Sequence, residues 1–290
     1  MTDSLTDRRV VRALLAEVGV RPSKRLGQNF LVDPGVLEDI DKVVSQAASD
    51  TIVEIGPGLG AVTEVLIRRA RRVLAVEVDR RLAGLLAERF GANERLEILS
   101  EDVLRLDLAD HLDQNRAYVV GSLPYRITAS ILKWLVENRR RFTGALLITQ
   151  REVAEKIAAS PGKEGTALGV LVCANADVEI VRRVARGCFV PAPEVDSTLW
   201  SLTFRARPRF ESSPETFYAV VRALYGTRRK MIRGVLRGLL PPESVGTALD
   251  EAGIDGTARG EELDFEQLDR LAMAVSSRLN ASLRKANRRP

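Results

Sequence analysis

Cysteine and histidine are scarce in this chain. Its 290 residues include two cysteines, Cys173 and Cys188, and one histidine, His111. The two cysteines form no CxxC pair, which excludes a disulfide framework and favours a reducing compartment. One histidine leaves little material for a histidine-based zinc site or for a Ser-His-Asp triad. We therefore expect no metal.

Long apolar runs are also missing. No window approaches the roughly 18 consecutive apolar residues of a membrane span, and the opening MTDSLTDRRV lacks the apolar run of a signal peptide. The chain is 45% hydrophobic and 29% charged, which is ordinary for a globular protein that can bury a sizeable core. These features predict a cytoplasmic protein with no membrane partner.

The excess of positive charge is small and unevenly spread. Lysine and arginine number 44 against 39 acidic residues, which gives a net charge of +5. Between residues 221 and 237 there are six basic residues and no acid, namely Arg222, Arg228, Arg229, Lys230, Arg233 and Arg237. Such a cluster can neutralise phosphates of a nucleic acid. A single run of this kind is more often a solvated helix face, so charge alone does not indicate RNA binding.

The order of apolar patterns predicts an α/β fold followed by helices. Short apolar runs alternate with helical patterns, which favours crossover units and a parallel sheet covered on both faces. The runs are 51–55, 72–78, 95–99, 117–121 and 145–149, with further strands expected at 177–184 and 197–204. Residues 205–214 are polar and contain two prolines, and 215–280 shows only helical spacing. We expect a first domain over 1–207, including an N-terminal helical and loop extension, and a small helical domain over 208–290.

A glycine loop and two spaced acids predict a nucleoside site. Gly56, Gly58 and Gly60 follow the first strand in VEIGPGLG, and Glu77 lies 21 residues after Gly56. Glycines allow a tight turn and close approach of a ligand, and an acid at this spacing can accept from ribose hydroxyls. Asp102, after the third strand, can accept from an adenine amino group. The loop reads GxGxG and not GxGxxG, so a nicotinamide dehydrogenase and an S-adenosylmethionine enzyme both remain open here.

The tetrapeptide Ser122-Leu123-Pro124-Tyr125 ends the fourth strand, where doubly wound sheets bind their ligands. An oxygen of Ser122 and the backbone carbonyl of Leu123 can accept from an exocyclic amino group and free its lone pair for attack. Pro124 fixes the turn, and Tyr125 offers a ring for an extruded base. In isolation, a simple strand-ending turn explains the tetrapeptide better, but beside the glycine loop and the two spaced acids a segment that holds a ligand is the better explanation.

Seven ordered motifs resemble those of the ribosomal RNA adenine N6-dimethyltransferases, over about residues 20–240. They are LGQNFL (26–31), VEIGPGLG (53–60), Glu77 in VEVD, Asp102 in EDVL, GSLPY (121–125), QREVAEKI (150–157) and FVPAPEVDS (189–197). The loop GPGLG favours the small-subunit branch, which dimethylates two adjacent adenosines in a hairpin loop near the 3′ end of 16S rRNA. The sister branch, the erythromycin-resistance enzymes of 23S rRNA, has a glycine loop similar to GSGKG.

The resemblance implies a Rossmann-like class I methyltransferase sheet with a small all-helical RNA-binding domain, and S-adenosylmethionine as cofactor. It assigns cofactor contacts to Asn29, Leu31, Gly56, Gly58, Glu77, Asp102 and Ser122. It assigns the target adenine to Ser122, Leu123, Pro124 and Tyr125, with Phe189 stacking on the flipped base opposite Tyr125. The expected partner is 16S rRNA or a precursor of the small ribosomal subunit, bound by a monomer with a role in subunit biogenesis.

Two departures from the family pattern keep alternatives open. The family usually has asparagine where this chain has Ser122, and a Tyr-Gly stretch where it has KEGTALGV (163–170). A serine hydroxyl can still accept from the amino group, so activity is expected. The alternatives are a 23S rRNA adenine methyltransferase and a ribosome-assembly protein that binds RNA without catalysis.

Overall fold

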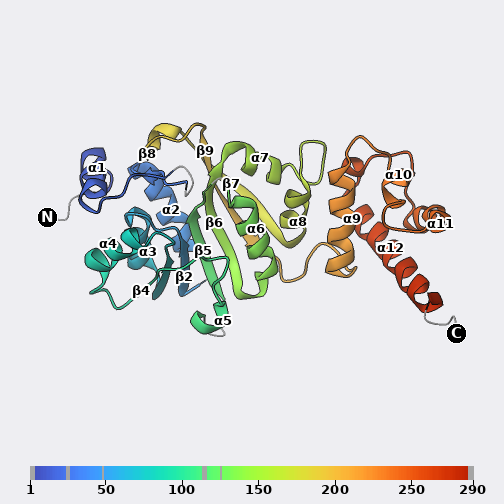
Figure 1. The fold of residues 1–290 in the computed structure, drawn as a ribbon, viewed down its shortest axis with the longest axis horizontal. Coiled ribbons are helices and arrows are strands. Elements are labelled where there is room, and N and C mark those ends of the chain that lie inside the picture. Colours follow the sequence, from blue (N-terminus) through green and yellow to red (C-terminus); the bar gives the residue numbers. More distant parts are fainter. Residues whose placement is uncertain (1–3, 24–26, 48, 113–115, 125, 287–290) are drawn as a thin grey trace. The chain divides into compact units, whose positions relative to one another are not determined.

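A seven-stranded sheet organises the first part of the chain (Figure 1). The computed structural model describes residues 4–23, 27–47, 49–112, 116–124 and 126–286, with side chains up to Leu279. The strand order is β4-β3-β2-β5-β6-β9-β7. The strands are β2 (Thr51–Ile55), β3 (Arg72–Val76), β4 (Leu96–Leu99), β5 (Ala117–Ser122), β6 (Phe142–Gln150), β7 (Ala176–Val184) and β9 (Ser197–Phe204).

Strands β2 to β6 pair in parallel, and β9 runs antiparallel to β6. The predicted parallel sheet is therefore confirmed. Its strands are apolar runs because both faces are covered: Val53, Leu74 and Val119 are all fully buried. Strand order reverses between β2 and β5, so the connections leave these two strands in opposite directions. A crevice forms at such a point, beyond the carboxyl ends of the strands.

Helices flank this sheet (Figure 1). They are α1 (Arg8–Glu17), α2 (Pro34–Gln46), α3 (Ala61–Arg69), α4 (Arg80–Phe90), α5 (Leu108–His111), α6 (Thr128–Glu137), the short η1 (Arg139–Arg141) and α7 (Arg151–Ala158). Helix α2 begins as its sequence predicts: the Asp33 side chain accepts from Val36 N at 2.9 Å, and Pro34 takes the first helical position. Of the helices in the described ranges, none is long and apolar enough to cross a membrane.

A second, two-stranded sheet joins distant parts of the chain. β1 (Phe30–Leu31) pairs antiparallel with β8 (Phe189–Val190), which follows η2 (Arg186–Cys188). This pairing sets the LGQNFL motif beside FVPAPEVDS, although about 160 residues separate them. Val11 and Leu15 of α1 and Phe30 of β1 share one apolar cluster with Leu59 of the glycine loop. The N-terminal extension is thereby packed onto the ligand end of the sheet.

The remaining helices form a compact unit of their own. It contains α8 (Ala167–Asn175), α9 (Pro214–Gly226), α10 (Ile232–Leu236), α11 (Pro242–Ala252), η3 (Gly260–Glu262) and α12 (Phe265–Ala286). The unit spans 155–176 and 205–290, and the other unit spans 1–154 and 177–204. The sequence predicted a single domain boundary after residue 207, whereas the structure also places 155–176 in the second unit. The reason is that Val170 and Ala174 of α8 are buried in the same core as Phe217 and Val221 of α9.

Gly144 in β6 marks a place where the sheet leaves no room for a side chain. A Cβ there would lie 2.3 Å from the Leu202 carbonyl oxygen and 3.0 Å from the Tyr118 ring. We expect Gly144→Ala to lower the free energy of unfolding by about 2–3 kcal/mol, because the neighbouring backbone has to move. Urea titration measures this.

The matched control is Gly84→Ala in α4, where an added Cβ meets nothing within 4 Å. Alanine in a helix interior is expected to raise stability by about 0.5–1 kcal/mol. An unchanged urea midpoint for Gly144→Ala would contradict the close packing of β6 on β9.

Candidate functional site

A cavity of about 340 Å³ opens at the carboxyl ends of β2, β3 and β5. Its size lies at the lower end of the range that small-molecule sites occupy, roughly 300–1,000 Å³. Eight of the residues singled out from sequence line it: Asn29, Leu31, Gly56, Gly58, Glu77, Asp102, Ser122 and Pro124. The structure thus brings the N-terminal motif, the glycine loop, both acids and the strand-ending segment to one place.

The glycine loop forms one wall of the cavity. Gly56 has φ +68°, and an added Cβ there would meet no atom within 4 Å, so the loop is open to an approaching ligand at this point. Gly58 has φ +61°, and its Cβ would lie 3.1 Å from the Phe30 ring. These positions need glycine for conformation, and at Gly58 also for space. The loop therefore admits a ligand at Gly56 while the N-terminal segment packs on Gly58.

Glu77 directly follows β3 and is 5% exposed. Its Oε2 accepts from Gly58 N at 3.1 Å, and its Oε1 accepts from Asp79 N at 2.9 Å. Burial raises the pKa of this carboxyl, and the backbone hydrogen bonds oppose that effect. Each oxygen keeps a lone pair after these bonds. The geometry therefore offers two adjacent acceptors to a diol.

Asp102 and Ser122 stand at the other strand ends. Asp102 Oδ1 accepts from Leu104 N at 3.0 Å, and Oδ2 has no hydrogen bond within the described residues. Ser122 is the last residue of β5, opposite Ile148 of β6, and is partly exposed. Both side chains thus line the cavity. They present oxygen acceptors to a ligand within it.

The three remaining predicted residues are placed differently. The Leu123 side chain is buried and does not line the cavity, and its backbone N donates to Ile148 O at 2.9 Å. Phe189 is 2% exposed and packs in an apolar cluster with Leu31, Val36 and Leu199. The structure therefore does not bring the Phe189 ring to the cavity surface. Tyr125 lies outside the described residues.

Glu54 belongs to the site but was not singled out from sequence. It lies in β2, is 2% exposed and lines the cavity, and its Oε2 accepts from Thr63 Oγ1 at 2.7 Å. Burial raises its pKa to about 8; the Thr63 hydrogen bond opposes this and the nearby Glu77 adds to it. A carboxyl in the otherwise apolar run TIVEI is the signal that could have revealed it.

The chain matches known proteins over most of its length. A family model described as ribosomal RNA adenine dimethylase covers residues 20–275. The protein named ribosomal RNA small subunit methyltransferase A in Geobacillus thermodenitrificans is 37% identical to this chain, over 91% of this chain and 94% of the relative. The protein of that name in Shouchella clausii is 39% identical, over 95% of each chain.

Two solved structures are also similar to this chain. The 23S rRNA methyltransferase ErmE is 30% identical, with a TM-score of 0.68 over 86% of this chain and 100% of that one. A dimethyladenosine transferase from Plasmodium falciparum shares the fold, with a TM-score of 0.74 and 22% identity over 86% of this chain and 98% of that one. The Rossmann-like methyltransferase fold predicted from the motifs is confirmed. The chain belongs to the ribosomal RNA adenine dimethylase family.

Proposed function

We propose that this chain transfers methyl groups from S-adenosylmethionine to the N6 amino groups of two adjacent adenosines in the 3′-terminal hairpin loop of 16S rRNA. One observation carries the proposal: a single cavity gathers the glycine loop, Glu77 and Asp102 with Ser122 and Pro124. The relatives named ribosomal RNA small subunit methyltransferase A support the choice of substrate. With the substrate comes the expectation of a cytoplasmic monomer that acts during small-subunit biogenesis.

The residues at the cavity fit this cofactor. Glu77 offers two acceptor oxygens to the ribose hydroxyls, and Asp102 Oδ2 offers one to the adenine amino group. The open space at Gly56 admits the methionine portion, and Asn29 and Leu31 line the same cavity. When bound, the cofactor supplies a methyl group on a positively charged sulfur.

The target adenine is held by the strand-ending segment. Ser122 Oγ and the Leu123 carbonyl accept from the N6 hydrogens, which turns the nitrogen lone pair toward the methyl group. As the new nitrogen–carbon bond forms and the sulfur–methyl bond breaks, the amino nitrogen loses one proton to water. Alignment and stabilisation of the developing charge are the main demands on the protein in such a transfer. Tyr125 and Phe189 are proposed to stack on the flipped base. For Phe189 this requires the ring to leave its apolar cluster.

The test uses small ribosomal subunits that lack the dimethyladenosines, alongside large-subunit RNA. Each is incubated with the protein and methyl-labelled S-adenosylmethionine, and the label is mapped by nucleotide. We expect N6,N6-dimethyladenosine near the 3′ end of 16S rRNA. Label only in 23S rRNA would place the chain with the resistance-type enzymes, and bound cofactor without any label would indicate a non-catalytic assembly protein.

Two variants at Ser122 check the assignment of the acceptor. Ser122→Ala is expected to lower the rate of transfer by about a hundredfold, with a smaller effect on cofactor affinity, because one preorganised partner of the amino group is lost. Ser122→Asn introduces the residue usual in the family and is expected to keep activity. Equal rates for Ser122→Ala and the unmodified protein would remove Ser122 from the mechanism.

A further inference from the structure

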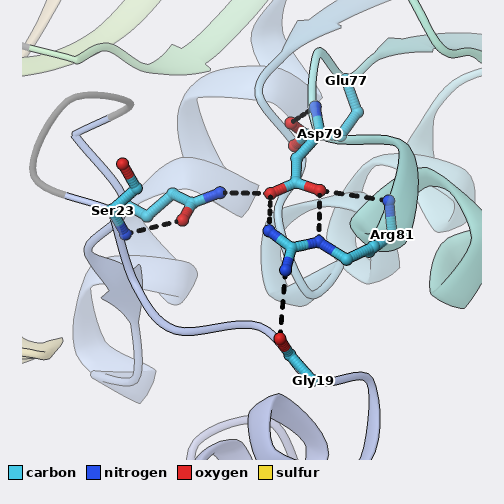
Figure 2. Close-up of polar contacts among 6 residues, drawn as sticks. Gly19, Ser23, Glu77, Asp79 and Arg81 are labelled. Carbon is cyan, nitrogen blue, oxygen red and sulfur yellow. Dashed lines mark hydrogen bonds and ion pairs between the residues drawn. The ribbon is translucent and has the colours of Figure 1, made fainter.

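One carboxylate ties the N-terminal segment to the end of β3. Figure 2 shows Asp79, which is 7% exposed, with partners on both sides. Its Oδ2 accepts from Gln28 Nε2 at 3.0 Å and from Arg81 Nη2 at 3.1 Å. Arg81 in turn donates from Nη1 to the Gly19 carbonyl at 3.0 Å. Asp79 therefore binds a residue 51 positions earlier in the chain, and Arg81 binds a residue 62 positions earlier.

The same residue touches the proposed ribose acid. The backbone N of Asp79 donates to Glu77 Oε1, while Glu77 Oε2 accepts from Gly58 N. Asp79 thus contacts the cofactor site through its backbone and the N-terminal segment through its side chain. Glycine loop, ribose acid and N-terminal motif form one continuous chain of hydrogen bonds.

Gln28 also binds the backbone of the N-terminal segment that lines the cavity. Its side-chain Oε1 accepts from Ser23 N at 2.9 Å, and its backbone N donates to Ser23 O at 3.2 Å. The neighbouring Gly27 has φ +62°, and a Cβ there would lie 2.7 Å from Pro124 Cβ. Residues 27–31 line the cavity. The fixed segment therefore lies against both the cofactor site and the strand-ending tetrapeptide.

The Asp79 carboxylate is charged in this network. Burial by itself would raise the pKa of Asp79, but the hydrogen bonds from Arg81 and Gln28 outweigh it and lower the pKa below its ordinary value. Hydrogen bonds to a charged acceptor are stronger than those between neutral groups. The Gln28 contact is of this kind, so its loss is felt at the segment that Gln28 holds.

We propose that Asp79 is a positioning residue, which holds residues 27–31 over the cofactor cavity through Gln28 and thereby controls cofactor retention. The inference rests on the proposed function, because the retained ligand is S-adenosylmethionine. It predicts that breaking the contact weakens cofactor binding and leaves the transfer step at saturating cofactor intact. A residue needed only for folding would not separate these two quantities.

Asp79→Ser is the first variant. Asp79 also caps α4 by accepting from Arg81 N, and serine is an equally good cap, but its side chain is too short to reach Gln28 as well. We expect the dissociation constant for S-adenosylmethionine to rise about tenfold or more, because the hydrogen bonds that the charged carboxylate accepts from Gln28 and from the Arg81 side chain are lost together. The kcat at saturating cofactor and the KM for RNA should stay within about twofold. Asp107→Ala, which removes the cap of α5 outside the cavity, is the control.

Exchanging the two partners gives a rescue test. Gln28→Glu places two carboxylates next to each other, and their repulsion should weaken cofactor binding more than Asp79→Ser does. Adding Asp79→Asn lets the new amide donate to the new carboxylate, which still accepts from Ser23 N. The double variant is therefore expected to bind cofactor more tightly than Gln28→Glu alone. Additive losses in the two single variants and the double variant would contradict a direct contact.

Hydrogen exchange without cofactor provides a readout independent of activity. Amides of residues 27–31 are expected to exchange faster in Asp79→Ser than in the unmodified protein, while amides of β2 and β5 do not change. Failure of the unmodified protein to bind S-adenosylmethionine would overturn the proposed function. Normal binding by the unmodified protein, with the same affinity and exchange in Asp79→Ser, would overturn this inference alone.

Discussion

Replacing Glu77 with alanine is expected to raise the dissociation constant for S-adenosylmethionine about a hundredfold or more. Two hydrogen bonds from ribose hydroxyls to a buried carboxylate would be lost, and each bond of this type contributes about 1.5–3 kcal/mol. Even at the lower end the sum is about 3 kcal/mol, which corresponds to more than a hundredfold in affinity. Isothermal titration calorimetry with the cofactor measures the change directly.

Glutamine is not a neutral substitute at this position. Both Glu77 oxygens already accept from backbone N–H groups, of Gly58 and of Asp79. The amide of a glutamine has one acceptor, so its NH₂ would face one of these donors. We therefore expect Glu77→Gln to lose most of the affinity that Glu77→Ala loses, although the side chains differ by little in shape.

The control removes a carboxylate of the same charge outside the cavity. Glu64→Ala lies on α3, just after the glycine loop, where Glu64 pairs with Arg68 at 3.7 Å in solvent. Exposed pairs of this kind contribute about 0–1 kcal/mol to stability, so neither fold nor affinity should change. Unchanged affinity in a folded Glu77→Ala variant would show that the ribose is held elsewhere.

The strands that build the site could be predicted because they are buried on both faces. Apolar runs such as 51–55 and 117–121 coincide with β2 and β5 almost residue by residue. Residues that follow such strands meet at one sheet edge whatever lies between them in the chain. This is why Gly56, Glu77, Asp102 and Ser122 were expected at one edge of the sheet, whereas their contacts with the cofactor were implied by the family resemblance.

Contacts that depend on long-range packing could not be predicted in this way. In the structure β6 begins at Phe142, earlier than the predicted run 145–149. The predicted run is too short because Gly144 interrupts the apolar pattern, at a place where β9 leaves no room for a side chain. Helix α8 packs with the C-terminal helices although strands β7 and β9 follow it in sequence. The Gln28–Asp79 bond joins two polar side chains 51 residues apart. Periodicity carries no information about such pairs, since any surface position allows the same residue types.

Phe189 illustrates that a motif does not determine where a side chain points. The motif FVPAPEVDS identifies the segment, and the structure places it beside LGQNFL through the pair Leu31 and Phe189. Phe189 is nevertheless buried in the apolar cluster that also contains Val36 and Leu199, and it is not among the residues that line the cavity. A motif specifies which residue types are present, whereas the rotamer depends on the apolar neighbours that α2 and β9 supply.

A second large effect is expected in the pH dependence of stability, through Glu54. Burial raises the pKa of Glu54 from an ordinary 4.5 to about 8 in the folded protein. Between these values the unfolded chain releases a proton that the folded protein keeps. The unfolded state is therefore stabilised relative to the folded state, and the contribution of Glu54 to stability falls as pH rises from about 4.5 to 8. The full pKa difference sets an upper limit of about 5 kcal/mol on this loss.

Glu54→Gln should remove this dependence, because the amide does not titrate and its oxygen can still accept from Thr63 Oγ1. We expect the variant to gain stability relative to the unmodified protein as pH rises from 5 to 9, by about 2–4 kcal/mol as measured by urea unfolding at each pH. Taking the difference between the two proteins cancels the titration of every group that does not interact with Glu54. Glu64→Gln, at an exposed carboxylate, should show no such trend. A difference between Glu54→Gln and the unmodified protein that stays constant with pH would mean that Glu54 is ionised in the folded cavity.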